Sequence, residues 1–132
     1  MLPMYDLILV PGIISAFALV VAFGFRRYVV RQDRGTERMK EIQQFIREGA
    51  WTFMREEVQV FAVVMVILAA LLWGIFYWEV AVAFLIGAIL SMSAAFAGMD
   101  AATQSNGRTT HAARTSFKKA LNIGISGGAV MG

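Results

Sequence analysis

The stretch that decides the fold runs from Val58 to Met99 and reads VQVFAVVMVILAALLWGIFYWEVAVAFLIGAILSMSAAFAGM. Glu79 is its only charged side chain. About 20 apolar residues are enough for a helix to cross a bilayer, so this stretch is long enough to cross twice. A glycine and four aromatic residues surround Glu79, and aromatic residues of this kind gather at membrane–water interfaces. We therefore predict a tight helical hairpin with spans over residues 58–78 and 80–99.

The composition is typical of a protein that lies in a lipid bilayer. The chain has 132 residues, of which 58% are hydrophobic, and its mean hydropathy is +0.64. It has no cysteine, which excludes a disulfide framework, a thiol nucleophile and a thiolate metal site. The net charge is +3, but the basic residues flank apolar spans and form no face interleaved with aromatic residues. We therefore predict no nucleic-acid partner.

The part before the hairpin predicts another span and an amphipathic helix. Residues 7–25 carry no charge and are just long enough to cross a core of about 30 Å. No basic residue precedes them, unlike in a secretory signal peptide, so we expect a retained first span. In residues 26–57, Gly35 breaks the helix, Thr36 can cap the next one, and apolar residues then recur at helical spacing. This helix should run into the second span, with a polar face of solvated ion pairs rather than a catalytic pair of carboxylates.

The third span and the segments after it predict a close helix contact and an incomplete fourth span. Small residues line one face of the third span, mostly four residues apart: Ala83, Gly87, Ser91, Ala95 and Gly98. Such a face lets helices approach closely in lipid, so we expect it to pack on protein while the second span faces lipid more. Residues 100–119 are predicted to be a polar connection with a turn at Asn106-Gly107. Residues 120–132 are apolar but too short to cross, which indicates an N-terminal membrane fragment, residues 1–132, cut inside a fourth span.

The distribution of positive charge predicts the orientation. All twelve Lys and Arg residues lie in the two connections, residues 26–57 and 100–119. Three crossings place both connections on one side of the membrane, and the positive-inside rule makes that side cytoplasmic. The N-terminus and the aromatic turn should then lie outside the cell. We predict an all-α, multi-pass protein of the plasma membrane, and the absence of a targeting peptide suits a prokaryote.

Catalytic motifs are absent from the sequence. There is no Walker-type loop, no His/Glu metal pair at helical spacing and no arrangement that suggests a Ser–His–Asp triad. His111 is the only histidine, and we expect it to be solvated because no second ligand stands at metal spacing. Asp6, Glu79 and Asp100 are placed at membrane interfaces, where a charge costs less than at the bilayer centre. We assign no catalytic, cofactor-binding or metal-ligating residue to this chain.

The residues after the third span stand in the order of a known family. The matching segments are GMDAAT at 98–103, NGRTT at 106–110, KALN at 119–122 and SGGAVMG at 126–132. With the helix before the second span, their order and spacing resemble the membrane-bound inorganic pyrophosphatases, which are ion pumps driven by pyrophosphate. The resemblance covers about residues 39–132, and the first span matches by position only. Asp100 and Ser105 depart from the commoner basic residue and alanine, which we interpret as surface variation without consequence.

This resemblance implies a larger, homodimeric pump that would hydrolyse magnesium-bound pyrophosphate on the cytoplasmic side and move protons or sodium outward. Its Mg²⁺ ligands, and any K⁺ or Na⁺ site, would lie beyond this chain, which should be inactive without the remaining spans. The resemblance to the outer helices of the family carries over no catalytic residue. Four basic residues near the substrate side invite a role in steering pyrophosphate, but topology-setting charges explain them better: Arg108, Arg114, Lys118 and Lys119.

Two other classes of function stay open from the sequence. The chain is alternatively a small, non-enzymatic membrane scaffold or interaction protein whose short fourth helix is re-entrant, or part of a transporter that does not hydrolyse pyrophosphate. Further apolar spans encoded after Gly132, followed by a segment rich in Asp and Lys, would support the pump. A stop codon at that point would support the scaffold, and release of phosphate from pyrophosphate separates the pump from the transporter.

Overall fold

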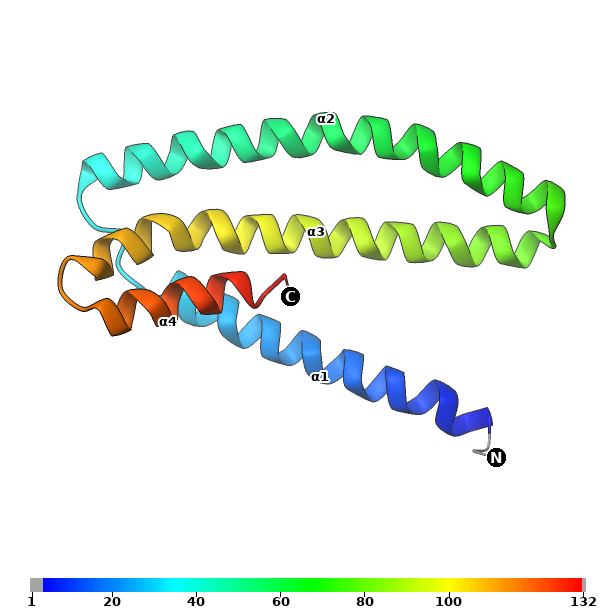
Figure 1. Ribbon diagram of the computed structural model, residues 1–132, viewed down its shortest axis with the longest axis horizontal. Coiled ribbons are helices and arrows are strands. Elements are labelled where there is room, and N and C mark those ends of the chain that lie inside the picture. Colours follow the sequence, from blue (N-terminus) through cyan, green and yellow to red (C-terminus); the bar gives the residue numbers. More distant parts are fainter. Residues whose placement is uncertain (1–3, 132) are drawn as a thin grey trace.

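The fold is a set of four helices, and the computed structural model describes residues 4–131 (Figure 1). The helices are α1 (Met4–Val30), α2 (Glu37–Ile75), α3 (Trp78–Ala113) and α4 (Phe117–Gly128). No strand occurs in the described residues, and α1, α2 and α3 are each long and apolar enough to cross a membrane. The predicted all-α class of a polytopic membrane protein is therefore confirmed.

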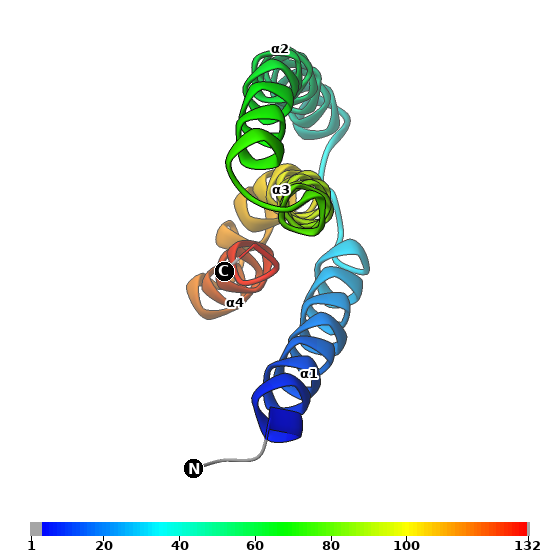
Figure 2. The same ribbon diagram turned by 90° about the vertical axis from the view of Figure 1, so that its right-hand side faces the viewer.

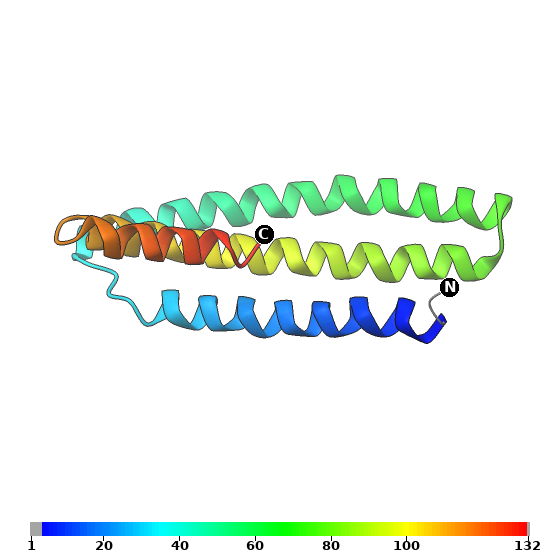
Figure 3. The ribbon, with the colours of Figure 1, turned by 60° about the horizontal axis from the view of Figure 1, so that its bottom comes forward.

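The helices pack around α3. The antiparallel helices α2 and α3 lie side by side along most of their length (Figures 1 and 3). On the other side of α3 from α2, α1 contacts α3 and α4 (Figure 2). The α1–α2 and α3–α4 connections lie at one end of the molecule, which we call the basic end, and the α2–α3 turn lies at the other. A buried apolar cluster joins α1, α3 and α4 near the basic end: Val29, Ala112, Ala120 and Ile123.

The start of α2 follows the sequence prediction. Gly35 has a φ of +81°, a left-handed conformation that favours glycine, and Thr36 is the N-cap. The Thr36 hydroxyl accepts a hydrogen bond of 3.4 Å from the Met39 backbone N–H. From there α2 runs without a break to Ile75, so the amphipathic helix does continue into the second apolar stretch.

The predicted hairpin turn is also confirmed. Only Phe76 and Tyr77 separate α2 from α3. The Phe76 N–H donates to the Leu72 carbonyl at 2.8 Å, which satisfies one of the orphan carbonyls at the end of α2. Tyr77 and Trp78 remain exposed, as expected for aromatic residues at a membrane surface.

The turn predicted at Asn106-Gly107 is wrong, because α3 continues to Ala113 and makes most of the expected polar connection helical. Gly107 instead marks a close approach between helices. A Cβ at this position would lie 2.8 Å from Oε1 of Gln43 on α2. The glycine that suggests a turn in the sequence therefore serves helix packing.

The small-residue face of α3 is covered at only one end. Gly98 is buried, and a Cβ there would lie 2.8 Å from the Met131 side chain after α4. Towards the hairpin turn, Ala83, Gly87 and Ser91 are exposed in the described structure. The expected packing of this face on protein is thus seen where α4 reaches and not beyond it.

Gly127 provides a test of the α3–α4 contact. A Cβ at Gly127 would overlap Cβ and Oγ of Ser105 on α3, whereas a Cβ at the neighbouring Gly128 would meet nothing within 4 Å. We expect Gly127→Ala to lower the free energy of unfolding of the complete polypeptide by about 1–3 kcal/mol, measured by denaturant titration in detergent. Gly128→Ala is the matched control and should be neutral or slightly stabilising. Adding Ser105→Gly to Gly127→Ala should recover part of the loss, and no recovery would contradict the assigned contact.

Candidate functional site

A cluster of polar side chains at the basic end joins three helices, and we call it the polar junction: Arg26, Gln43, Arg47, Asp100, Gln104 and Arg108. On α3 its members are four residues apart, and the two from α2 are also four apart, so each set lies on one helix face. Arg26 comes from α1. The helical spacing therefore brings the three segments' polar groups to one place, although they are far apart in the sequence.

Asp100 is the acceptor at the centre of the polar junction. Its Oδ1 accepts from Arg47 Nη2 at 2.6 Å, and its Oδ2 accepts from Arg26 Nη2 at 2.9 Å. Gln104 Nε2 also donates to Oδ2, at 2.7 Å. The Asp100 side chain is only 14% exposed, so this carboxylate links α1 and α2 to α3. The interpretation of Asp100 as surface variation without consequence is wrong.

Ser105 is a second position where that interpretation is wrong. It is 5% exposed and faces Gly127 of α4. Its hydroxyl donates to the Ala102 carbonyl at 2.8 Å, which satisfies the buried polar group within α3. Ser105 therefore belongs to the contact between α3 and α4.

Arg108 holds the end of α1. Its side chain is 1% exposed, and its guanidinium donates to three backbone carbonyls, those of Gln104 at 2.6 Å, Gln32 at 3.0 Å and Val30 at 3.3 Å. Val30 is the last residue of α1, where carbonyls have no intrahelical partner and carry partial negative charge. Arg108 therefore acts as a side-chain cap supplied by another helix. Because it is buried, it is not available to steer a soluble anion.

The other basic residues considered for steering stand apart from the polar junction. Arg114 follows α3, while Lys118 and Lys119 lie in the first turn of α4, and all three are exposed. Their positions are compatible with charges that set the topology. Nothing in the described structure brings them to one binding site.

Gln43 was missed by the sequence analysis. It is 7% exposed, and its Nε2 donates to the Thr103 and Gln104 carbonyls at 3.4 and 3.3 Å. Its Oε1 is buried and has no hydrogen-bond partner among the described residues. The sequence contained one sign of its role, the four-residue spacing from Arg47, which places both residues on one face of a helix. The atoms that accept from Gln43 are backbone carbonyls, and a sequence pattern does not reveal such partners.

His111 is not the solvated side chain of a polar connection that we expected. It lies on α3, is partly buried, and packs on the connection between α1 and α2. Its Nε2 is 3.8 Å from Oδ2 of Asp33, and its Nδ1 is buried without a partner among the described residues. The Gly35 N–H donates to Oδ1 of Asp33 at 2.9 Å and lowers the pKa of that carboxyl. Asp33 is thus kept anionic beside the histidine.

Glu79 is another acidic residue that we placed at an interface, and it has no ion-pair partner in the described part of the chain. Glu79 lies in the first turn of α3 and is exposed, where a carboxylate suits the positive end of a helix dipole. Asp6 lies in α1, and its side chain is outside the described part of the structure. Within the described residues, no three His, Asp or Glu side chains gather in a way that could hold a metal ion.

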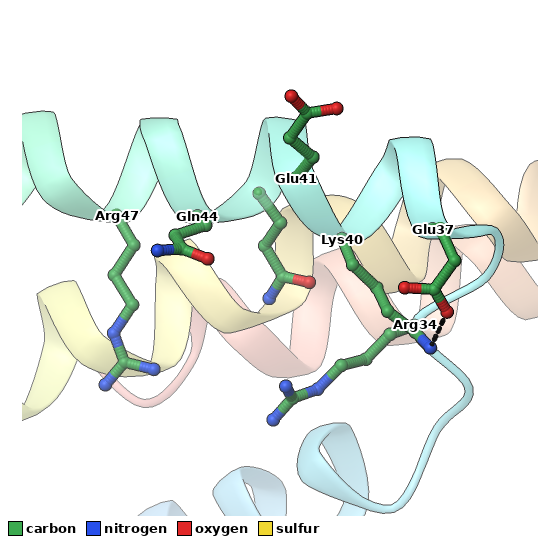
Figure 4. A pocket seen from close by; sticks show the side chains of 7 residues that line it. Arg34, Glu37, Lys40, Glu41, Gln44 and Arg47 are labelled. Atoms are coloured by element: carbon green, nitrogen blue, oxygen red, sulfur yellow. Dashed lines mark hydrogen bonds and ion pairs between the residues drawn. The ribbon is translucent and has the colours of Figure 1, made fainter.

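A polar groove of about 450 Å³ opens beside the polar junction. We call it the basic groove, and it is lined by Arg34, Glu37, Lys40, Glu41, Gln43, Gln44 and Arg47. Figure 4 shows Arg34, from the α1–α2 connection, and Arg47, from α2, pointing to the same side of α2, whereas Glu41 points away. The groove offers cationic and amide donors but no group arranged as a nucleophile with a base. Its chemistry suits the binding of an anion and not covalent catalysis.

Comparison with known proteins agrees with the resemblance seen in the sequence. Residues 16–132 match the family described as inorganic H⁺ pyrophosphatase. The chain is 44% identical, over 119 residues, to the K⁺-stimulated pyrophosphate-energized sodium pump of Thermotoga maritima, covering 86% of this chain and 16% of that protein. It is 42% identical, over 118 residues, to a putative pump of the same kind from Clostridium tetani, covering 89% of this chain and 18% of that protein.

A relative with a different named ion matches nearly the whole chain. The K⁺-insensitive pyrophosphate-energized proton pump of Methanosarcina mazei is 36% identical over 131 residues, which is 98% of this chain and 20% of that protein. The chain thus spans at most about a fifth of the length of these three relatives. Its apolar helices and this match over most of its residues lead to one conclusion: the chain is a membrane protein and belongs to the inorganic H⁺ pyrophosphatase family.

Proposed function

We propose that this chain is the amino-terminal part of a pyrophosphate-energised pump that moves sodium ions or protons out of the cell. The observation that carries the proposal is the identity of 42–44% to pumps of this name over 86–89% of the chain. Hydrolysis of pyrophosphate would be carried out by the remaining spans. This chain would supply outer helices that pack on them.

The residues of this chain would contribute rigidity. Asp100 links α1 and α2 to α3, and Arg108 links the end of α1 to α3, so these helices are tied at the basic end by charge-assisted hydrogen bonds. Such a tied unit would give the catalytic helices a fixed surface to move against. We assign no step of the reaction to its side chains.

The proposal includes a location and an assembly. Placing the basic end in the cytoplasm and the N-terminus outside a prokaryotic plasma membrane would satisfy the positive-inside rule. The complete pump would be a homodimer with Mg²⁺ bound to its substrate and, as the names of the relatives suggest, with or without stimulation by K⁺. The described residues of this chain gather no set of metal ligands, so we assign no magnesium ligand to it.

The complete gene product in inverted membrane vesicles provides the test. With Mg²⁺ present, we expect pyrophosphate to be hydrolysed to phosphate, together with uptake of sodium or protons that stops when pyrophosphate is omitted. Titration with K⁺ then assigns the pump to the stimulated or the insensitive type. Ion movement without phosphate release would favour the transporter, and neither activity in correctly inserted protein would favour the scaffold. Either result would contradict the proposed function.

A further inference from the structure

The basic groove contains more positive charge than its carboxylates neutralise. Lys40 pairs with Glu37 at 2.7 Å, as Figure 4 shows, while the carboxylate of Glu41 is turned away and pairs with Arg38. Asp100 is shared between Arg47 and Arg26, and Arg34 has no hydrogen-bond or ion-pair partner among the described residues. The cations that line the groove are Arg34, Lys40 and Arg47, and only Lys40 is paired with a carboxylate that also lines it. The groove therefore has an unbalanced positive charge that an anion would neutralise.

The buried Arg108 repels two cations of the groove. Arg34 and Arg47 both lie close enough to Arg108 for their charges to act on it, and Arg108 is buried and cannot move into solvent. Clustered guanidinium groups are common where proteins bind phosphate, because the planar fork of donors matches phosphate oxygens. Arg47 uses only Nη2 towards Asp100, so its other donors are free of an assigned partner in the described structure. A bound phosphate would thus relieve repulsion and satisfy donors together.

The surroundings of the groove indicate the source of the phosphate. Arg26, at the edge of the polar junction, directly follows the charge-free run of α1, and Val21 and Phe25 of that run are exposed. The described parts of α1 and α2 make no contact with each other and lie on opposite sides of α3 (Figure 2). A soluble anion would use the polar part alone. A phospholipid would place its phosphate in the groove and its acyl chains along the exposed side chains of α1.

We propose that the basic groove binds the phosphate of an anionic phospholipid through Arg34 and Arg47, with the lipid's acyl chains lying along α1. The proposal does not use the pump activity, but it requires that this face of α1 meets lipid and not the remaining spans in the complete polypeptide. Basic residues beside a membrane-spanning helix attract anionic lipids in general. We expect Arg34 to contribute more to the binding of the lipid than Arg31, which carries the same charge.

Arg31 provides the matched control for Arg34. Both are exposed arginines in or beside the α1–α2 connection, but only Arg34 lines the groove. Native mass spectrometry of the complete polypeptide in detergent would measure the affinity for phosphatidylglycerol and phosphatidylcholine. We expect the polypeptide to bind phosphatidylglycerol more tightly than phosphatidylcholine. Arg34→Gln should lower the affinity for phosphatidylglycerol about five-fold, which is the effect of removing one cation near an anionic headgroup. Arg31→Gln should change the affinity less than two-fold.

Three outcomes would overturn the proposal. Equal losses in the two variants would show diffuse attraction and no site, and equal affinity for the two lipids would show that the charge of the headgroup is not recognised. The third outcome is that the groove binds a soluble anion. Calorimetry would measure the binding of inorganic phosphate to the complete polypeptide in phosphatidylcholine nanodiscs. Binding of phosphate there that is lost in Arg34→Gln would assign the groove to a soluble anion.

Discussion

Replacing Arg108 with methionine is expected to lower the free energy of unfolding of the complete polypeptide by about 2–4 kcal/mol, because carbonyls that accept from its buried guanidinium lose a charged donor. The variant keeps the apolar stem but removes the donor of two carbonyls at or just after the end of α1, those of Val30 and Gln32, whereas the Gln104 carbonyl still accepts from Gln43. Buried acceptors that lose a charged donor carry the full cost of desolvation. Unfolding in mixed micelles, followed by circular dichroism, would measure the change.

Two further variants separate capping from charge in the Arg108 experiment. Arg108→Lys keeps the charge, but an ammonium lacks the planar fork that reaches three separate carbonyls, so about half of the loss should remain. Arg114→Met removes an exposed arginine six residues later on the chain and should cost less than about 0.5 kcal/mol. A loss for Arg108→Met no larger than that of Arg114→Met would contradict the capping role.

Replacing Asp100 with asparagine should give the second-largest effect, a loss of about 1–3 kcal/mol in the free energy of unfolding. The amide keeps the shape of the side chain but removes the negative charge between Arg26 and Arg47. The cost is below that of a fully buried pair, because the two arginine side chains are 45% and 41% exposed and can turn towards water. A double-mutant cycle with Arg47→Met would measure the coupling between the two residues.

The cycle has a clear expected value and a control. We expect a coupling free energy of about 1 kcal/mol or more between Asp100 and Arg47, because substitutions within one hydrogen-bonded network do not have additive effects on stability. The pair of Arg38 and Glu41 is exposed on α2, and its coupling should be below about 0.5 kcal/mol. If both couplings were equally small, Asp100 would not link the helices as the contacts indicate.

Much of the fold could be predicted because lipid leaves few alternatives. An apolar stretch as long as residues 58–99, with Glu79 as its only charged side chain, must satisfy its backbone hydrogen bonds internally, which makes it helical. The start of α2 was predictable for a local reason, since Gly35 takes a left-handed conformation and Thr36 caps the helix that follows. Both features depend on residues that are close in the sequence.

The polar junction could not be predicted because its partners are distant and many of its acceptors are backbone atoms. Residues 100–113 are rich in polar side chains, which favours a connection outside the helix, yet Thr103, Gln104, Ser105 and Arg108 are buried between helices. The four-residue spacing of Asp100, Gln104 and Arg108 was the available signal of a helix face. That Arg108 would cap α1 depends on tertiary packing, which places the end of one helix beside the side of another.

The capping of α1 by Arg108 has a consequence for biogenesis. The ribosome makes Arg108 76 residues after Gln32, one of its acceptors. At about 5–20 residues per second, some 4–15 s pass before the donor exists. Until then, water would have to supply the donors for the last carbonyls of the first helix, so we expect the end of that helix to be fixed only after the third helix has been translated.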